Sequence, residues 1–273
     1  MLGDKSAALE TLRQQITAIE TNPALKDSGD VAIPDGFLAT PRGSLHEVFA
    51  DSLIGAGPAL GFAFAQAKSL VDPVRPAILY LQLQSDALET GLPYGLGLKK
   101  FGLPAEQVVF VRPQTIIELL WAVEEAIACK AVAAVVADIG HAHKALDFTA
   151  SRRMSLRTAA SGASVFLVRY ARDREASAAK FRWKVVPELS RSPAFDERAP
   201  GPPRWRVVLE KGSLGKRRRV APDGEEYLVD WSENGFVLAD IESRRAAAIG
   251  SPRRPPLPHA APTALGDRLS EAG

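Results

Sequence analysis

The sequence predicts an α/β protein in which helices cover both faces of a mostly parallel, twisted sheet. Three observations support this fold class. Short apolar segments rich in Val, Ile and Leu alternate with segments long enough to form helices. With 46% hydrophobic residues, the chain can cover a sheet on both faces. After Arg182 the pattern changes to short strands separated by Gly, Asp-Gly and Asn-Gly turns, which predicts an antiparallel C-terminal meander.

The N-terminal residues are predicted to form an amphipathic helix over about 5–21. Leu9, Leu12, Ile16 and Ile19 recur at helical spacing. Such a narrow apolar stripe does not fold alone in water, because most helical stability comes from packing. We therefore expect this assembly helix to cap the core or to dock on a neighbouring subunit.

The core is predicted to alternate strands with helices and then to end in the meander. We expect parallel strands at 44–49, 77–81, 108–111, 133–138 and 164–168. Helices are expected at about 58–70, 96–102, 115–129 and 150–161. Meander strands are expected at 205–209, 217–220, 226–231 and 236–239.

Composition divides the chain into a helix and link at 1–25, a core at 26–241 and a tail at 242–273. The tail is Pro/Ala-rich without periodicity, so we expect it to be disordered. No segment is apolar enough to span a bilayer and no secretory signal is recognisable, so a cytoplasmic protein without membrane contact is expected. The single cysteine, Cys129, excludes an intramolecular disulfide and a cysteine-based zinc site, and its apolar surroundings predict a core position.

Residues 43–235 resemble the RecA core in the order of their elements. The segments 43–49, 78–84 and 133–138 resemble the strand before the phosphate loop, the strand of the catalytic glutamate and the Walker B strand. Residues 179–182 are similar to the segment after the second DNA-binding loop. The shortened loop after Tyr170 and the run Ser-Ala-Ala-Lys-Phe-Arg-Trp resemble the ImuA branch, which comprises RecA-like accessory proteins of bacterial mutagenesis cassettes. SulA-type division inhibitors share this superfamily.

The segment that resembles a phosphate loop lacks the residues that such a loop needs. A working loop needs a lysine for the β/γ-phosphate oxygens and a hydroxyl for magnesium. Here these positions fall on Ala56 and Gly57, and the catalytic glutamate position falls on Gln84. We therefore expect no ATP hydrolysis, no enzymatic activity and no cofactor. The degenerate nucleotide loop and its companions comprise Ala50, Gly55, Ala56, Gly57, Gln84 and Asp138. Without the hydroxyl ligand, Asp138 is more typical of a structural strand-end residue than of a Walker B carboxylate.

Two other ligand patterns are weaker. Residues 55–61 resemble a loosened dinucleotide fingerprint, but residues 51–54 intervene between the strand and the first glycine, and no acidic residue ends the second strand. His141 and His143 follow Asp138 without a placed carboxylate, which favours solvent-facing loop residues. No metal site is predicted.

Positive charge gathers in three segments, although the formal net charge is only +2. One lies on the predicted helix 150–161, one surrounds the loop that faces DNA in RecA relatives, and one falls at a hairpin turn. These side chains are candidates for contact with DNA phosphates or with a protein partner, and a solvated face is the alternative. The candidates are Arg152, Arg153, Arg157, Arg169, Arg172, Arg174, Lys180, Arg182, Lys216, Arg217, Arg218 and Arg219.

The resemblance implies a non-catalytic accessory protein of DNA damage-induced mutagenesis, which supports error-prone translesion synthesis. Its expected partner is an ImuB-type polymerase-like protein. Further expected contacts are RecA, a second copy through the assembly helix, and weak, sequence-independent DNA binding. The alternative is a SulA-like inhibitor that binds the cell-division GTPase FtsZ, and a RecA-type ATPase is the third hypothesis.

Overall fold

The computed structural model describes Leu38, residues 40–193, Asp196, and residues 199–214, 220–221, 224–232 and 235–239. The assembly helix with Leu9, Leu12, Ile16 and Ile19 lies outside the described residues. So do the basic turn 216–219, most of the predicted strand 217–220, and the tail 242–273. The described residues belong to one unit that ends at Ala239.

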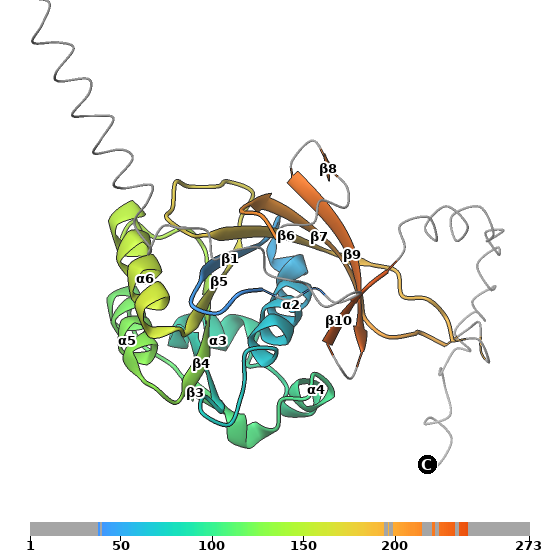
Figure 1. Ribbon diagram of the computed structural model, residues 1–273, viewed down its shortest axis with the longest axis horizontal. Coiled ribbons are helices and arrows are strands. Elements are labelled where there is room, and N and C mark those ends of the chain that lie inside the picture. The colour runs from blue at the N-terminus through green and yellow to red at the C-terminus, as the bar shows by residue number, and fades with distance from the viewer. Residues whose placement is uncertain are drawn as a thin grey trace, which may run out of the picture. The chain divides into compact units, whose positions relative to one another are not determined.

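The strands form a single sheet in the order β10-β9-β7-β6-β1-β5-β4-β2-β3, with the short β8 paired to β9 (Figure 1). Strands β6, β1, β5, β4, β2 and β3 are parallel, and β7, β9 and β10 continue the sheet antiparallel. The predicted α/β class, with its antiparallel C-terminal extension, is confirmed. The strands are β1 Leu45–Ala50, β2 Ala77–Gln82, β3 Val108–Val111, β4 Val132–Gly140, β5 Ser164–Tyr170, β6 Phe181–Glu188, β7 Arg204–Lys211, β8 Val220–Ala221, β9 Gly224–Ser232 and β10 Gly235–Leu238.

Helices cover both faces of the parallel part of the sheet. Helix α2 packs on one face, and α5 and α6 pack on the other (Figure 1). Thr115 and Asp147 cap the first turns of α5 and α6 through their side chains. The helices are α2 Ala56–Lys68, α3 Gln84–Thr90, α4 Gly95–Lys100, α5 Ile116–Ala128 and α6 Phe148–Ser161, with 3₁₀ turns at Leu53–Gly55 and Ala105–Gln107.

Two apolar clusters lie on opposite faces of the sheet. On the α2 side, Phe62 packs against the buried indole of Trp183, and Trp205 and Trp231 belong to the same cluster. On the α5/α6 side, Leu119, Val123 and Met154 pack against strands β4 and β5. Every residue of β4 is buried, as expected for a central parallel strand covered on both sides. This arrangement leaves the carboxyl edge of the parallel strands as the place where polar side chains gather.

The connection from β5 to β6, residues 171–180, crosses β1 without forming a helix. Strand β1 lies between β5 and β6 and is parallel to both, so the chain must return from the carboxyl edge to the amino edge. It does so on the α6 side, where Ala179 is buried among the residues of that cluster. The Ala178 N–H donates to the Ser151 hydroxyl at 3.0 Å, and the Lys180 N–H donates to the Leu45 carbonyl at 2.9 Å. We call residues 171–180 the crossing segment.

The predicted core position of Cys129 is wrong. The residue is exposed at the end of α5, not buried in the core. The buried stripe of α5 consists of Leu119, Leu120, Val123, Ala126 and Ile127, and Cys129, which follows the helix, lies outside this stripe.

Among the described helices, none has the length and apolar character needed to cross a membrane.

Candidate functional site

The segment compared with a phosphate loop joins β1 to α2 and packs tightly against the end of the strand. Ala50 is buried, and a Cβ added at Gly55 would lie 2.7 Å from the Ala50 Cβ. The Gly55 N–H closes a 3₁₀ turn by donating to the Ser52 carbonyl at 3.0 Å. Ala56 begins α2, and a Cβ at Gly57 would meet no atom within 4 Å. The loop therefore presents neither a cation nor a hydroxyl at these two positions.

Asp51 follows β1 directly and binds two cations of the chain itself. Its carboxylate lies 2.9 Å from the Lys184 Nζ and 3.4 Å from an Nη of Arg174. Partial burial raises the pKa of Asp51, but hydrogen bonds and charge from Lys184 and Arg174 outweigh this effect, and the net shift is downward. At neutral pH, Asp51 is an anion located next to the degenerate loop.

Asp138 lies at the carboxyl end of β4 in a buried polar cluster. The Tyr80 hydroxyl donates to its carboxylate at 2.9 Å, and the Gln82 amide lies 3.5 Å from the same oxygen. Burial raises the pKa of Asp138, the hydroxyls of Tyr170 and Tyr80 lower it, and the Asp86 carboxylate raises it slightly; the net pKa is about 6.

The residues around Asp138 differ from those that the sequence selected. Gln82, and not Gln84, contacts Asp138, because Gln84 is exposed at the start of α3. The buried Gln82 Oε1 has no hydrogen-bond partner among the described residues. The cluster supplies oxygen atoms and one carboxylate able to exchange a proton near neutral pH. It contains no side-chain cation that would hold a phosphate.

No metal centre forms within the described part of the chain. His141 is exposed and His143 is half-buried, in the loop after β4. The described residues bring no three metal-ligating side chains together.

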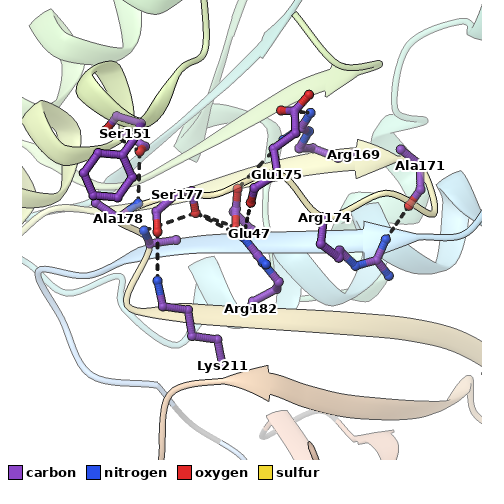
Figure 2. A network of polar contacts seen from close by, with 12 residues as sticks. Glu47, Ser151, Arg169, Ala171, Arg174, Glu175, Ser177, Ala178, Arg182 and Lys211 are labelled. Carbon is purple, nitrogen blue, oxygen red and sulfur yellow. Dashed lines mark hydrogen bonds and ion pairs between the residues drawn. The ribbon is translucent and has the colours of Figure 1, made fainter. Parts of the chain in front are cut away.

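A buried ion-pair network holds the crossing segment against β1 (Figure 2). Glu47 points from β1 into the network and is 1% exposed. Its carboxylate accepts from the Arg182 Nε at 2.8 Å and from the Ser177 hydroxyl at 2.7 Å, and it lies 3.9 Å from an Nη of Arg169. Arg169 in turn donates to Glu175 at 3.0 Å. We call Glu47, Arg169, Glu175, Ser177 and Arg182 the Glu47 network.

The Glu47 network places two predicted DNA-contact residues largely inside the molecule. Arg169 is 1% exposed, and the Arg182 side chain is 14% exposed. Removing one partner of a buried ion pair typically costs about 3–5 kcal/mol, because the other charge is left without compensation. The two guanidinium groups therefore serve to hold the crossing segment in place, and Arg169 offers almost no surface to another molecule.

Arg174 joins the crossing segment to β7. Its guanidinium donates to the Glu210 carboxylate at 2.9 and 3.2 Å and to the Ala171 carbonyl at 2.5 Å (Figure 2 shows the Ala171 contact). The guanidinium lies 4.1 Å from the Phe49 ring centre, and those of Arg169 and Arg182 lie at 5.4 and 5.7 Å. One buried aromatic ring thus stabilises three cations.

A charged pocket of about 560 Å³ opens beside the degenerate loop. Of the basic residues around the crossing segment, Arg172, Arg174, Arg182 and Lys184 line it. Arg172 is exposed. Lys180 lies outside this lining, with its Nζ 5.7 Å from the Phe181 ring centre. The complete lining is Asp51, Arg172, Arg174, Arg182, Lys184 and Glu210.

The basic residues of α6 lie on its exposed side, away from this lining. Arg153 Nε donates to Glu124 of α5 at 2.6 Å, and Arg157 pairs with the same carboxylate at 3.3 Å. Arg152 is exposed. Two of the three arginines thus join α6 to α5. Trp121, on the same helix as Glu124, is 65% exposed.

Sequence reasoning missed the carboxylates that neutralise the basic run. Glu47 and Glu210 are far from the arginines in sequence but contact them across neighbouring strands. One signal was available: His46 and Glu47 interrupt an otherwise apolar strand, and a charged residue in a buried strand requires a partner.

Sequence comparison identifies the family. No family model matches the chain. Over 200 residues, the chain is 34% identical to Protein ImuA from each of two strains of Caulobacter vibrioides, and the match covers 68% of this chain and 76% of the relative. This similarity favours the ImuA branch over the SulA branch that the sequence motifs had left open. The chain belongs to the ImuA family.

Proposed function

We propose that this protein is a non-catalytic accessory protein of DNA damage-induced mutagenesis, and that it supports error-prone translesion synthesis. The observation that carries the proposal is the combination of ImuA family membership with a loop that lacks both the lysine and the hydroxyl of a phosphate site. Phosphoryl transfer depends on positioned cations and a group that orients water. A chain without these groups at that loop acts by contact.

The strand order supports a RecA-like origin. Strand β1 lies between β5 and β6, and its carboxyl end leads through the 3₁₀ turn into α2. Strand–loop–helix is the arrangement that phosphate loops use, and α/β sheets bind ligands at the carboxyl edge of their strands. In this chain Asp51 puts a negative charge next to that loop, in contrast to the lysine of a working phosphate loop.

The proposed partner is an ImuB-type polymerase-like protein. Exposed apolar side chains support a contact function: Ile54, in the 3₁₀ turn before α2, is 94% exposed, and Ile117 and Trp121 on α5 are 71% and 65% exposed. Exposed tryptophans are enriched among the residues that contribute most to protein–protein binding. Contacts with RecA and with a second copy of the chain are secondary parts of the proposal. Direct contact with DNA enters it as weak, sequence-independent binding.

The test is a binding assay with the full-length chain on a support. We expect it to capture a purified ImuB-type protein and not purified FtsZ. The variant Ile117→Ser/Trp121→Ser tests whether the exposed α5 residues take part, with Val74→Ser as a control, because Val74 is also exposed (77%) but lies in the loop between α2 and β2. Capture of FtsZ without capture of the ImuB-type protein would contradict the proposed function.

A further inference from the structure

The charged pocket is lined entirely by ionisable side chains, in which cations outnumber carboxylates by two. Asp51 comes from the end of β1, Arg172 and Arg174 from the crossing segment, and Lys184 from β6. These segments are far apart in sequence but meet where β1 ends, because Lys184 pairs in register with Phe49. The fold thus concentrates positive charge beside a loop that carries none of its own.

The four cations differ in how firmly the protein holds them. Arg182 is bound by Glu47, Ser177 and the Glu175 carbonyl, so it contributes charge from the pocket wall. Arg174 is fixed by Glu210 and stacked on Phe49. No hydrogen bond or ion pair of the Arg172 side chain occurs among the described residues, so its guanidinium can reach a ligand.

Asp51 bridges two of the pocket cations, Lys184 and Arg174. It contacts Lys184 at 2.9 Å and Arg174 at the longer distance of 3.4 Å, and its side chain is 39% exposed. Exposed ion pairs contribute only about 0–1 kcal/mol. An incoming oxyanion can therefore replace Asp51 as the partner of Lys184 and Arg174 at low cost.

We infer that this pocket binds a phosphate group, with Arg172, Arg174 and Lys184 as its ligands and Asp51 as a competing internal anion. Guanidinium groups match the geometry of phosphate oxygens and lysine adds a point charge. The pocket volume of about 560 Å³ falls in the range of ligand sites larger than a single ion. The pocket therefore has room for a phosphate group that is part of a larger molecule, either a nucleic-acid backbone or a free polyphosphate.

The pocket recognises the phosphate group and not a base. Its lining contains no aromatic side chain, and the neighbouring Phe49 is buried beneath the arginines. Sequence readout needs base-edge contacts, and stacking needs an exposed ring. Single-stranded and duplex DNA of any sequence should therefore bind through this pocket, weakly and with strong dependence on salt. This inference deepens the proposed function by naming the chemistry of its DNA contact.

The experiment measures binding of fluorescently labelled single-stranded and duplex DNA to the full-length chain across a salt series. Arg172→Ala/Lys184→Ala should weaken binding at low salt by about tenfold or more, and should reduce the log-log salt slope by about 0.7 for each lost contact with a single strand. The matched control is Lys99→Ala/Lys100→Ala, which removes two exposed charges from α4, outside the pocket. Asp51→Asn should tighten binding about fivefold, because the competing anion is lost.

Two further arms identify the ligand. Sodium tripolyphosphate should displace the labelled DNA from the wild type. Its affinity for the wild type is measured by calorimetry and compared with that of DNA: tighter binding of tripolyphosphate identifies a free polyphosphate as the ligand, and tighter binding of DNA identifies a nucleic-acid backbone. A poly-glutamate peptide should displace the DNA poorly. Equal losses in the pocket variant and the α4 control, or stronger binding of poly-glutamate than of DNA, would overturn the inference. Capture of the ImuB-type protein by Arg172→Ala/Lys184→Ala is scored separately, so the pocket can fail while the proposed function stands.

Discussion

The carboxylate of Glu47 on β1 accepts a 2.8 Å hydrogen bond from the Nε of Arg182 on β6, and Glu47 is buried, with 1% of its surface exposed. The same carboxylate also accepts from Ser177, which lies in the crossing segment. One buried side chain therefore fixes the spacing of two neighbouring strands and the path of the segment that connects β5 with β6.

Glu47→Gln should destabilise the protein by about 3 kcal/mol or more, because Arg169 and Arg182 would keep their buried charges without a carboxylate. Urea unfolding measures the free energy. Glu106→Gln, at an exposed glutamate, is the control and should change stability by less than about 0.5 kcal/mol. Combining Glu47→Gln with Arg169→Gln should cost less than the sum of the two single changes, since the residues act as one network. Additive costs would show that they are not coupled.

The buried imidazole of His46 should make stability rise with pH. It is stacked between Phe166 and Phe181 at 4.5 and 4.9 Å, and its Nδ1 accepts from the Trp183 N–H at 3.3 Å. Burial, assisted by the charge of Lys180, lowers the pKa of His46 from 6.5 to about 3. The unfolded chain therefore binds the proton more readily between these values, and folding gains up to about 1.4 kcal/mol per pH unit as pH rises through them.

Asp138 should make stability fall as pH rises, which is opposite to the effect of His46. Its folded-state pKa of about 6 exceeds the ordinary value of 3.8, so the folded chain holds the proton more tightly between these values. Stability from this group is present at low pH and is lost as pH rises toward 6. Between about pH 4 and pH 6 the effects of His46 and Asp138 oppose each other, and the wild-type slope is small.

Two variants separate these contributions in urea unfolding across that pH window. Asp138→Asn should leave the rising contribution of His46, so that stability increases with pH more steeply than in the wild type. His46→Phe keeps a ring between Phe166 and Phe181 and should leave the falling contribution of Asp138. Identical pH slopes in both variants and the wild type would exclude these assignments.

The purified protein should release no phosphate from ATP above a buffer blank. The resemblance to RecA places Ala56, Gly57 and Gln84 where an active site has its lysine, hydroxyl and glutamate, and α2 begins without a basic residue. A coupled phosphate assay with and without magnesium measures this. Magnesium-dependent release that disappears in Asp138→Ala would mean that the chain is an ATPase after all.

Deleting residues 1–22 should change oligomer size or partner binding without unfolding the core. The Leu9, Leu12, Ile16 and Ile19 stripe predicts a helix that needs a docking surface. Size-exclusion chromatography with light scattering and the ImuB-type capture assay would show the change. Unchanged mass, binding and stability would make the segment dispensable.

Hydrophobic patterning predicted most of the parallel sheet but missed strand β6 and helix α3. The apolar runs at β2, β4 and β5 are bounded by turn residues, which makes them recognisable without a structure. Helix α3 buries none of its residues, so its sequence carries no apolar stripe to detect. Local periodicity finds an element only when one of its faces is buried.

The candidate site was less predictable because it depends on pairs that form across strands. The basic run after Tyr170 was visible in the sequence, but its partners Glu47 and Glu210 lie on β1 and β7. Only the register of neighbouring strands brings these charges together. Gln84 was selected instead of Gln82 because the sequence does not show where β2 ends: the strand stops at Gln82, and Gln84 already belongs to α3, where it is exposed.

The placement of the four tryptophans gives the protein a built-in optical probe. Trp183, Trp205 and Trp231 are buried, and their indole N–H groups donate to His46, to the Pro58 carbonyl and to the Lys100 carbonyl. Trp121 on α5 is 65% exposed. Iodide should therefore quench mainly the red-shifted emission of Trp121, and a molecule that covers the outer side of α5 would protect that emission while the blue-shifted light of the three buried indoles stays constant.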